Sequence, residues 1–263
     1  PDFVANDIIP RLEVQYAGVF YSNFIDFKKG FTTDSDHFFE ITVADEFRHN
    51  WVEGGGFSVH NDSTSSFLFL ARSHHLKLDW LEISGEAGQN QVVFGSQNTT
   101  IDNALIHDIA REISNTGVLV KNSIVYNIRD RFILDKGTMI SATVYAPEPS
   151  GDFDGDRIFR QCHCEGVYLY HNHTKVTLDA FNSCTGDYNA ALAQTSGVPG
   201  SNSVTILDDS DLVDPTTNDL RLKSTSFLMT AGENGGPIGA VFASEPSGGV
   251  LDLKSSIANN LTS

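Results

Sequence analysis

A short apolar pattern recurs four times between residues 78 and 145, and this repeat limits the fold more than any other feature of the chain. The segments LDWLEI, IDNALI, VKNSIV and ISATVY occupy residues 78–83, 101–106, 120–125 and 140–145, with starts 23, 19 and 20 residues apart. A unit of about 20 residues built from short strands cannot bury its own apolar face, so it must stack on its neighbours. The repeat therefore predicts a solenoid.

The positions of the apolar residues within each repeat indicate how the chain turns. They stand first, fourth and sixth, as expected for an inward residue, a bend, and a strand with alternating side chains. The bend carries Asn103 and Asn122, and Asn tolerates the left-handed backbone that a recurrent corner needs. Parallel connections are right-handed in nearly all cases, so we predict an all-β fold, a right-handed parallel β-helix. One inner column of this β-helix should contain Ile83, Ile106, Val125 and Tyr145.

The C-terminal part of the chain shows a resemblance to known proteins. Residues 212–226 read LVDPTTNDLRLKSTS, and Ala231-Gly232 and the sequence GPIGA at 236–240 follow. This succession resembles the closing segment of pectate-lyase-like right-handed β-helix proteins, although Phe227-Leu228 stands where Pro-Ala is usual. Residues 30–50 resemble the opening coils of environmental and phage-associated members.

The resemblance implies a single β-helix domain over residues 1–263. Its parts would be an N-terminal cap with the first coils (1–50), central coils (51–210) and a closing segment (211–263). It leaves the chemistry open, because this superfamily includes lyases, glycoside hydrolases, phage tailspikes and non-catalytic surface proteins.

The charge balance excludes some partners. The chain has 34 acidic and 17 basic residues and a formal net charge of −17. Nucleic acids and anionic membranes are bound by clustered Lys and Arg, so neither is an expected partner. Together with the resemblance, this acidity favours an extracellular, cell-surface or virion-associated protein.

One group of residues combines a base, an aromatic ring and carboxylates. His107 and Tyr126 hold the same repeat position, so their side chains should stack about 4.8 Å apart on the outer surface. Polysaccharide lyases need a base beside the uronate, and glycoside hydrolases need paired carboxylates. The candidate catalytic residues are therefore His107, Asp108, Arg129, Asp130 and Arg131, with Tyr126 as a platform for sugar. The alternative is a set of paired surface charges at coil corners.

Two further groups of residues, a pair of histidines and a set of three cysteines, are candidate binding sites. His171 and His173 alternate along one predicted strand and are candidate contacts to sugar hydroxyls, or else surface polar residues. Cys162, Cys164 and Cys184, together with the nearby histidines, offer thiolate and imidazole, the usual ligands of zinc. The spacing of the cysteines, about one coil, instead favours a buried column of cysteines.

An apolar stripe is predicted on the outside of the coils. Leu105, Ile124 and Val144 occupy the outward position before the last residue of their repeats, where solvent favours polar side chains. Something should cover this stripe, and the candidates are the N-terminal segment, the connection 147–159 or another subunit. Phage and surface β-helices commonly form trimers, so a homo-oligomer is one expectation.

Two function classes follow. The first is a carbohydrate-active enzyme, a polysaccharide lyase or a glycoside hydrolase, acting on an extracellular glycan. The second is a non-catalytic structural or adhesion module of a cell surface or a virion. Recognition of a polysaccharide is favoured, and turnover stays open.

A calcium site is predicted in the long connection after Tyr145. Asp152, Asp154 and Asp156 alternate around Gly155, and alternating carboxylates can supply several oxygens to one Ca²⁺. The alternative is a solvated acidic turn. Titration of the protein with calcium chloride by calorimetry should give a binding heat that is lost in the triple Asp→Asn variant. A native protein without heat, or a variant with the native heat, would refute this site.

Overall fold

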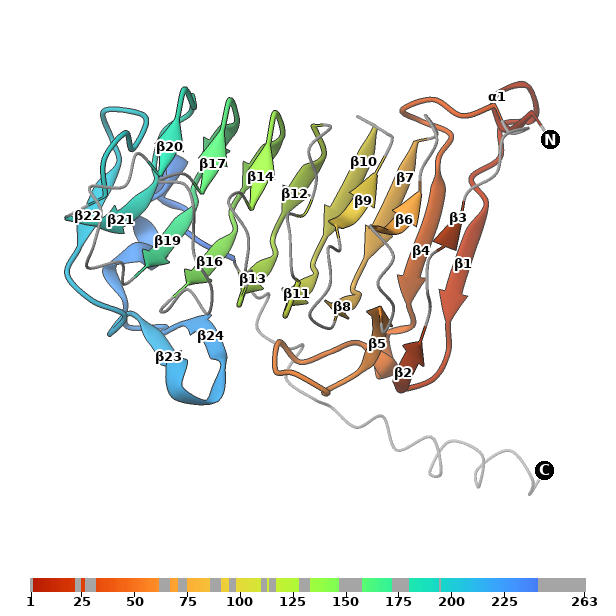
Figure 1. Cartoon of the computed structure of the whole chain (residues 1–263), viewed down its shortest axis with the longest axis horizontal. Helices are drawn as coiled ribbons and strands as arrows, with labels where there is room; N and C mark the ends of the chain where they lie inside the picture. The colour runs from red at the N-terminus through yellow and green to blue at the C-terminus, as the bar shows by residue number, and fades with distance from the viewer. Residues whose placement is uncertain are drawn as a thin grey trace, which may run out of the picture.

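The protein is a parallel β-solenoid, in which strands of successive coils lie side by side along the long axis (Figure 1). The computed structural model describes residues 2–21, 25–26, 32–61, 67–70, 75–85, 91–94, 98–109, 113, 117–127, 133–146, 158–171, 180–193 and 195–240. Within these residues the predicted solenoid is confirmed.

Two long parallel sheets form most of the solenoid. The first sheet contains, in spatial order, β1 (Arg11–Val14), β4 (Phe39–Val43), β7 (Leu76–Asp79), β10 (Thr99–Asp102), β12 (Leu119–Lys121), β15 (Thr138–Ile140) and β18 (His163–Glu165). The second sheet contains β2 (Gly18–Tyr21), β5 (Phe57–Asn61), β8 (Glu82–Gly85), β11 (Leu105–His107), β13 (Ile124–Tyr126), β16 (Thr143–Ala146), β19 (Tyr168–His171), β21 (Ala190–Leu192) and β22 (Val204–Ile206).

Shorter elements complete the described structure. Two three-stranded parallel sheets consist of β3 (Ile25–Asp26), β6 (Phe67–Leu70) and β9 (Gln91–Phe94), and of β14 (Leu134–Asp135), β17 (Phe159–Arg160) and β20 (Phe181–Asn182). The strands β23 (Leu212–Asp214) and β24 (Asp219–Leu222) pair antiparallel, and β24 lies beside β16 (Figure 1). The helices are α1 (Phe3–Asn6) and the 3₁₀ turns Asp45–Phe47, Pro215–Thr217, Phe227–Thr230 and Glu233–Gly235. In the described part of the chain, no helix has the length and apolar character needed to cross a membrane.

The core consists of columns of equivalent side chains from successive coils. In the second sheet Ile83, Ile106 and Val125 stack in register, as predicted, and all three are fully buried. The prediction for Tyr145 is wrong, because Val144 takes the inner position and Tyr145 points outward. The fourth repeat begins one residue earlier than the sequence pattern indicated, and a slip of one residue moves every side chain of a strand to the opposite face.

The corners between the two sheets have a common backbone conformation. Asn103 and Asn122 have φ values of 50° and 44°, and Trp80 and Ser141 hold the equivalent places with 60° and 48°. The Asn103 N–H donates to the carbonyl of Lys121 in the next coil at 3.2 Å. The predicted role of asparagine at a left-handed corner is therefore confirmed.

The apolar stripe on the outside of the second sheet is covered by the chain itself. Leu105 and Ile124 stack there and are fully buried, and Thr143 follows them in place of the predicted Val144. They share a hydrophobic cluster with Trp51 and with apolar residues of 212–240. The described cover thus comes from segments other than those predicted, and the connection 147–157 lies outside the described residues.

The three cysteines occupy the interior side of neighbouring coils. Cys164 follows Met139 in an inner column, and Cys162 is also buried. The backbone N–H of Cys162 lies 3.4 Å from Sγ of Cys184 in the next coil. The predicted stack is confirmed for Cys162 and the half-buried Cys184, whereas Cys164 lies over Met139, and all three are free thiols.

Truncation of a central column residue should weaken the whole solenoid. The Ile106→Ala variant should lose about 2–5 kcal/mol of unfolding free energy, because neighbouring coils cannot close the cavity. Leu207→Ala is the matched control, since Leu207 is 88% exposed, and it should change stability by less than about 0.5 kcal/mol. Equal urea midpoints for the two variants would contradict the central place of this column.

Candidate functional site

The predicted stack of His107 and Tyr126 is present on the second sheet. The two ring centroids lie 5.0 Å apart and the ring planes differ by 7°. The pair belongs to an outward column that continues with Tyr145 and Tyr170, whose centroids lie 5.1 Å apart. Parallel register thus places four aromatic side chains along one line on the outer face of the sheet.

Carboxylates flank His107 on both sides. Its Nδ1 lies 2.8 Å from Oδ2 of Asp108, and its Nε2 lies 3.2 Å from Oε1 of Glu82. Burial by itself lowers the pKa of His107, but the hydrogen bonds to Asp108 and Glu82 outweigh burial and raise the pKa to about 9. At neutral pH the ring is an imidazolium that donates both N–H groups, so it has no lone pair with which to accept a proton.

A loop of residues 49–56, called the covering loop, lies over this group. Its Gly54 N–H donates to Oε2 of Glu82 at 2.9 Å, and its Glu53 accepts a hydrogen bond from the Tyr126 hydroxyl at 3.3 Å. His107 and Tyr126 are consequently only 3% exposed. The sequence placed His107 on the open outer surface, and the covering loop accounts for the difference.

A second buried histidine holds the start of the covering loop. His49 Nε2 lies 3.1 Å from the carbonyl oxygen of Asn103, and the Trp51 N–H lies 3.4 Å from His49 Nδ1. One ring nitrogen therefore donates and the other accepts, which requires the neutral form. Burial lowers the pKa of His49 to about 4. The rings of Trp51 and Trp80 pack against it.

The other predicted site residues have different places. His171 is fully buried and its Nε2 lies 2.7 Å from Oγ1 of Thr195, so its side chain does not reach a surface groove. The remaining candidates lie outside the described residues and stay predictions: Arg129, Asp130, Arg131, His173, Asp152, Asp154 and Asp156.

Sequence reasoning missed the residues that complete the His107 group. Glu82 carried one available signal, since it is a carboxylate at the repeat position that Leu105 and Ile124 occupy in the next coils. Glu53 carried no such signal, because its contact with Tyr126 joins positions 73 residues apart.

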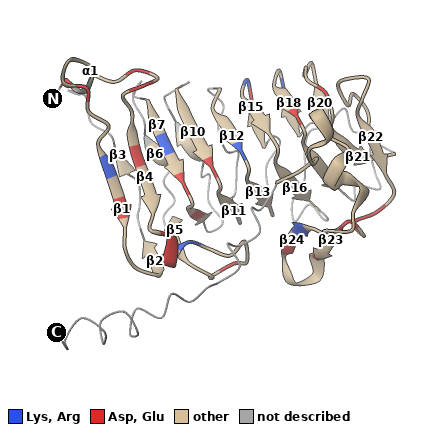
Figure 2. Cartoon of the chain, turned by 180° about the vertical axis from the view of Figure 1, so that it is seen from behind, with Lys and Arg blue, Asp and Glu red and all other residues tan. Residues whose placement is uncertain are grey.

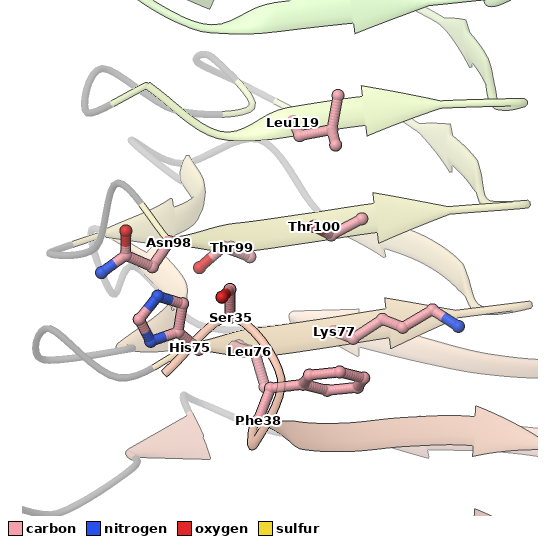
Figure 3. A pocket seen from close by; sticks show the side chains of 9 residues that line it. All are labelled: Ser35, Phe38, His75, Leu76, Lys77, Asn98, Thr99, Thr100 and Leu119. Atoms are coloured by element: carbon pink, nitrogen blue, oxygen red, sulfur yellow. The ribbon is translucent and has the colours of Figure 1, made fainter. Parts of the chain in front are cut away.

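A hollow of about 310 Å³ lies where β7, β10 and β12 of the first sheet begin. Figure 3 shows His75, Asn98 and the Thr99 side chain gathered near Ser35, with the Lys77 amine at the opposite end. The residues that line it are Ser35, Phe38, His75, Leu76, Lys77, Asn98, Thr99, Thr100 and Leu119. This hollow has polar and apolar walls and opens to solvent.

Two polar atoms in this hollow have no hydrogen-bond partner among the described residues. They are Oγ1 of Thr99 and Nδ1 of His75. Thr99 is only 1% exposed, so water does not readily reach its hydroxyl. A buried hydroxyl without a partner costs free energy, and a ligand recovers that free energy where the wall of the hollow adjusts to admit a partner.

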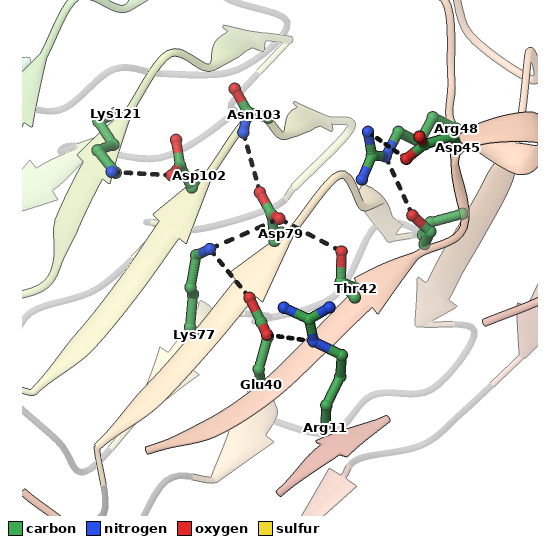
Figure 4. A network of polar contacts seen from close by, with 11 residues as sticks. Arg11, Glu40, Thr42, Asp45, Arg48, Lys77, Asp79, Asp102, Asn103 and Lys121 are labelled. Atoms are coloured by element: carbon green, nitrogen blue, oxygen red, sulfur yellow. Dashed lines mark hydrogen bonds and ion pairs between the residues drawn. The ribbon is translucent and has the colours of Figure 1, made fainter. Parts of the chain in front are cut away.

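A chain of ion pairs runs across the first sheet and includes Lys77, which also lines the hollow (Figure 4). Glu40 accepts from Arg11 at 2.6 Å and from Lys77 at 3.0 Å. Burial by itself raises the pKa of Glu40, but the contacts with Lys77 and Arg11 outweigh it, so the pKa lies below its usual value. Asp79 accepts from the Asn103 amide at 2.9 Å. Figure 2 shows basic and acidic residues along β1, β4, β7, β10 and β12. The charge of Lys77, which borders the hollow, is neutralised by its ion pair with Glu40.

Comparison with known proteins adds no family to these observations. No protein-family model matches the chain, and no curated protein matches it either.

The charge state of His49 should make the covering loop sensitive to acid. The unfolded chain takes up a proton near pH 6.5, whereas folded His49 does so only near pH 4, so stability should fall as the pH drops through this interval. The loss should approach about 3 kcal/mol and level off below pH 4.

Urea unfolding at pH 6.5 and pH 4.5 measures this effect. His49→Gln keeps a donor for the Asn103 carbonyl but does not titrate, so it should lose less stability between the two pH values than the native protein. His163→Gln is the control, because the His163 side chain is about half exposed. An acid-induced loss in His49→Gln as large as the native one would refute the assignment.

Proposed function

We propose that the protein binds a saccharide without net charge in the hollow on the first sheet. The observation that carries this proposal is the buried hydroxyl of Thr99, which has no partner among the described residues and belongs to a residue that lines the same hollow as Phe38. A sugar presents hydroxyl groups on its edge and C–H groups on its faces, so one sugar ring matches both features.

The lining of the hollow supports this class of ligand. Ser35, Asn98 and His75 provide hydrogen-bonding groups, and Phe38 provides an apolar ring against which a sugar face packs. The volume lies at the lower end of the range for small-molecule sites, which suits one or two sugar residues of a longer glycan. The row of outward side chains along the first sheet gives such a glycan a surface to follow.

Charge decides between neutral and acidic glycans. A net charge of −17 repels a polyanion at the encounter, and Lys77 is already paired with Glu40. A neutral polysaccharide is therefore the preferred partner, and an acidic one would need a bridging cation such as Ca²⁺.

Binding without turnover is the function we favour. The described members of the candidate catalytic group, His107 and Asp108, lie on the second sheet and do not line the hollow. His107 is also held as an imidazolium between two carboxylates. The resemblance to pectate-lyase-like right-handed β-helices supports a role at a cell surface or on a virion, in a monomer or a trimer.

Screening of the native protein on an array of neutral and acidic oligosaccharides tests the proposal, followed by calorimetry on the best ligand. Thr99→Val keeps the shape of the side chain and removes the hydroxyl, so affinity should fall about tenfold. Phe38→Ala should weaken binding by a similar factor, because the packing surface for the sugar face is lost. Thr138→Val, on β15 of the same sheet, is the control and should bind normally.

Two results would contradict the proposal. One is an array without any saccharide bound above background. The other is a ligand whose affinity is the same for the native protein and for Thr99→Val and Phe38→Ala.

A further inference from the structure

We propose that Glu53, His107 and Asp108 together bind a divalent transition-metal cation. Zn²⁺ is the cation for which the geometry and the test are given below. This site is separate from the saccharide hollow and uses other residues than the predicted calcium loop. It lies where the covering loop meets the end of β11.

The three side chains converge at ligand distance. One ligand atom from each residue, an oxygen of Glu53, a ring nitrogen of His107 and an oxygen of Asp108, lies within 4.8 Å of the other two. Zinc bonds of about 2.0–2.2 Å in tetrahedral geometry place neighbouring ligand atoms ~3.4 Å apart. His107 Nδ1 and Asp108 Oδ2 are 2.8 Å apart, and Glu53 is exposed, so rotation of its side chain can close the third side.

The surroundings of His107 match those of a metal-binding imidazole, and a cation at Nδ1 would displace the proton that this nitrogen shares with Asp108, so binding should release a proton and weaken as the pH falls. Glu82 lies at Nε2, at 3.2 Å, and so orients the ring with Nδ1 toward the other two side chains. A carboxylate behind the coordinating histidine is the usual arrangement at protein metal sites. Glu82 is itself fixed by the Gly54 N–H, and the Asp108 carboxylate is held by the Asn127 amide at Oδ1 and by the His107 ring at Oδ2.

The site combines a rigid interior side with an open outer side. His107 is 3% exposed, whereas the Asp108 side chain is 31% exposed and Glu53 faces solvent. A cation can enter from the side of Glu53, and one coordination position remains for water. One imidazole and two carboxylates suit zinc and neighbouring first-row metals, whereas Ca²⁺ and Mg²⁺ prefer oxygen ligands alone.

Metal binding at this place would join two distant parts of the chain. Glu53 belongs to the covering loop and His107 ends β11, so the cation would hold the loop over Leu105 and Ile124. A ligand that binds only the folded protein raises its stability in proportion to the logarithm of ligand concentration. Zinc should therefore raise the melting temperature.

The test is calorimetric titration of zinc chloride into protein that was freed of metal with a chelator. We expect one site in the native protein, and at least tenfold weaker binding in His107→Gln and in Glu53→Gln. Glu46→Gln removes an exposed carboxylate just before the covering loop and is the matched control, with native affinity expected. Glu53 is exposed, so its substitution tests the site without disturbing the core.

Thermal melts and cobalt spectra complete the test. Zinc should raise the melting temperature of the native protein and of Glu46→Gln, but not of Glu53→Gln. Cobalt(II) should give a spectrum without thiolate bands. The proposal is overturned if the native protein binds no zinc, if all variants bind it equally, or if thiolate bands show that the cysteines bind the metal.

Discussion

The backbone hydrogen bonds between successive coils decide which side chains of this protein lie above one another. Strands in parallel register place each residue directly over its equivalent in the neighbouring coil, so every column must be uniformly suited to its surroundings. The inner columns therefore consist of Ile, Val and Leu, as in Ile83, Ile106 and Val125. The corners hold residues that accept a left-handed backbone, such as Asn103 and Asn122. A residue misplaced by one position would point an apolar side chain to water and a polar one to the core.

The same parallel register also aligns apolar and aromatic side chains on the outer face of the second sheet, and other segments of the chain cover them. An apolar stripe and a line of aromatic rings stand on the outside of the second sheet, where water would otherwise reach them. The covering loop and residues 209–240 exclude that water. Each segment accepts a hydrogen bond from a tyrosine hydroxyl through a carboxylate, Glu53 from Tyr126 and Asp209 from Tyr145. Two histidines at the covering loop have opposite charge states. His49 is neutral because its partners are a carbonyl and an N–H, whereas His107 is charged because its partners are carboxylates.

The two proposed sites use opposite properties of the solenoid. The hollow lies on the first sheet, where polar and apolar residues line a space that opens to solvent and the buried hydroxyl of Thr99 has no partner among the described residues. The His107 group lies on the second sheet, where a loop encloses ionised side chains and lowers the local dielectric. Enclosure strengthens contacts between charges and favours a cation over a sugar. The strong acidity of the chain acts on both, because it disfavours anionic glycans and attracts cations.

The sequence by itself determined the solenoid, its asparagine corners, the cysteine stack and the pairing of His107 with Tyr126. These features depend on repeat spacing and strand alternation, which are local properties of the chain. The spacing placed the fourth repeat one residue too late, and the register of β13 with β16 shows that Val144 holds the inner position. Only the tertiary structure decided that His107 is buried between Glu82 and Asp108 and that Glu53 reaches Tyr126. It also decided that a segment before β4 and the starts of β7 and β10 enclose the hollow. These contacts join residues of different coils and loops, and no periodic pattern in a sequence reports where a non-repetitive loop comes to rest.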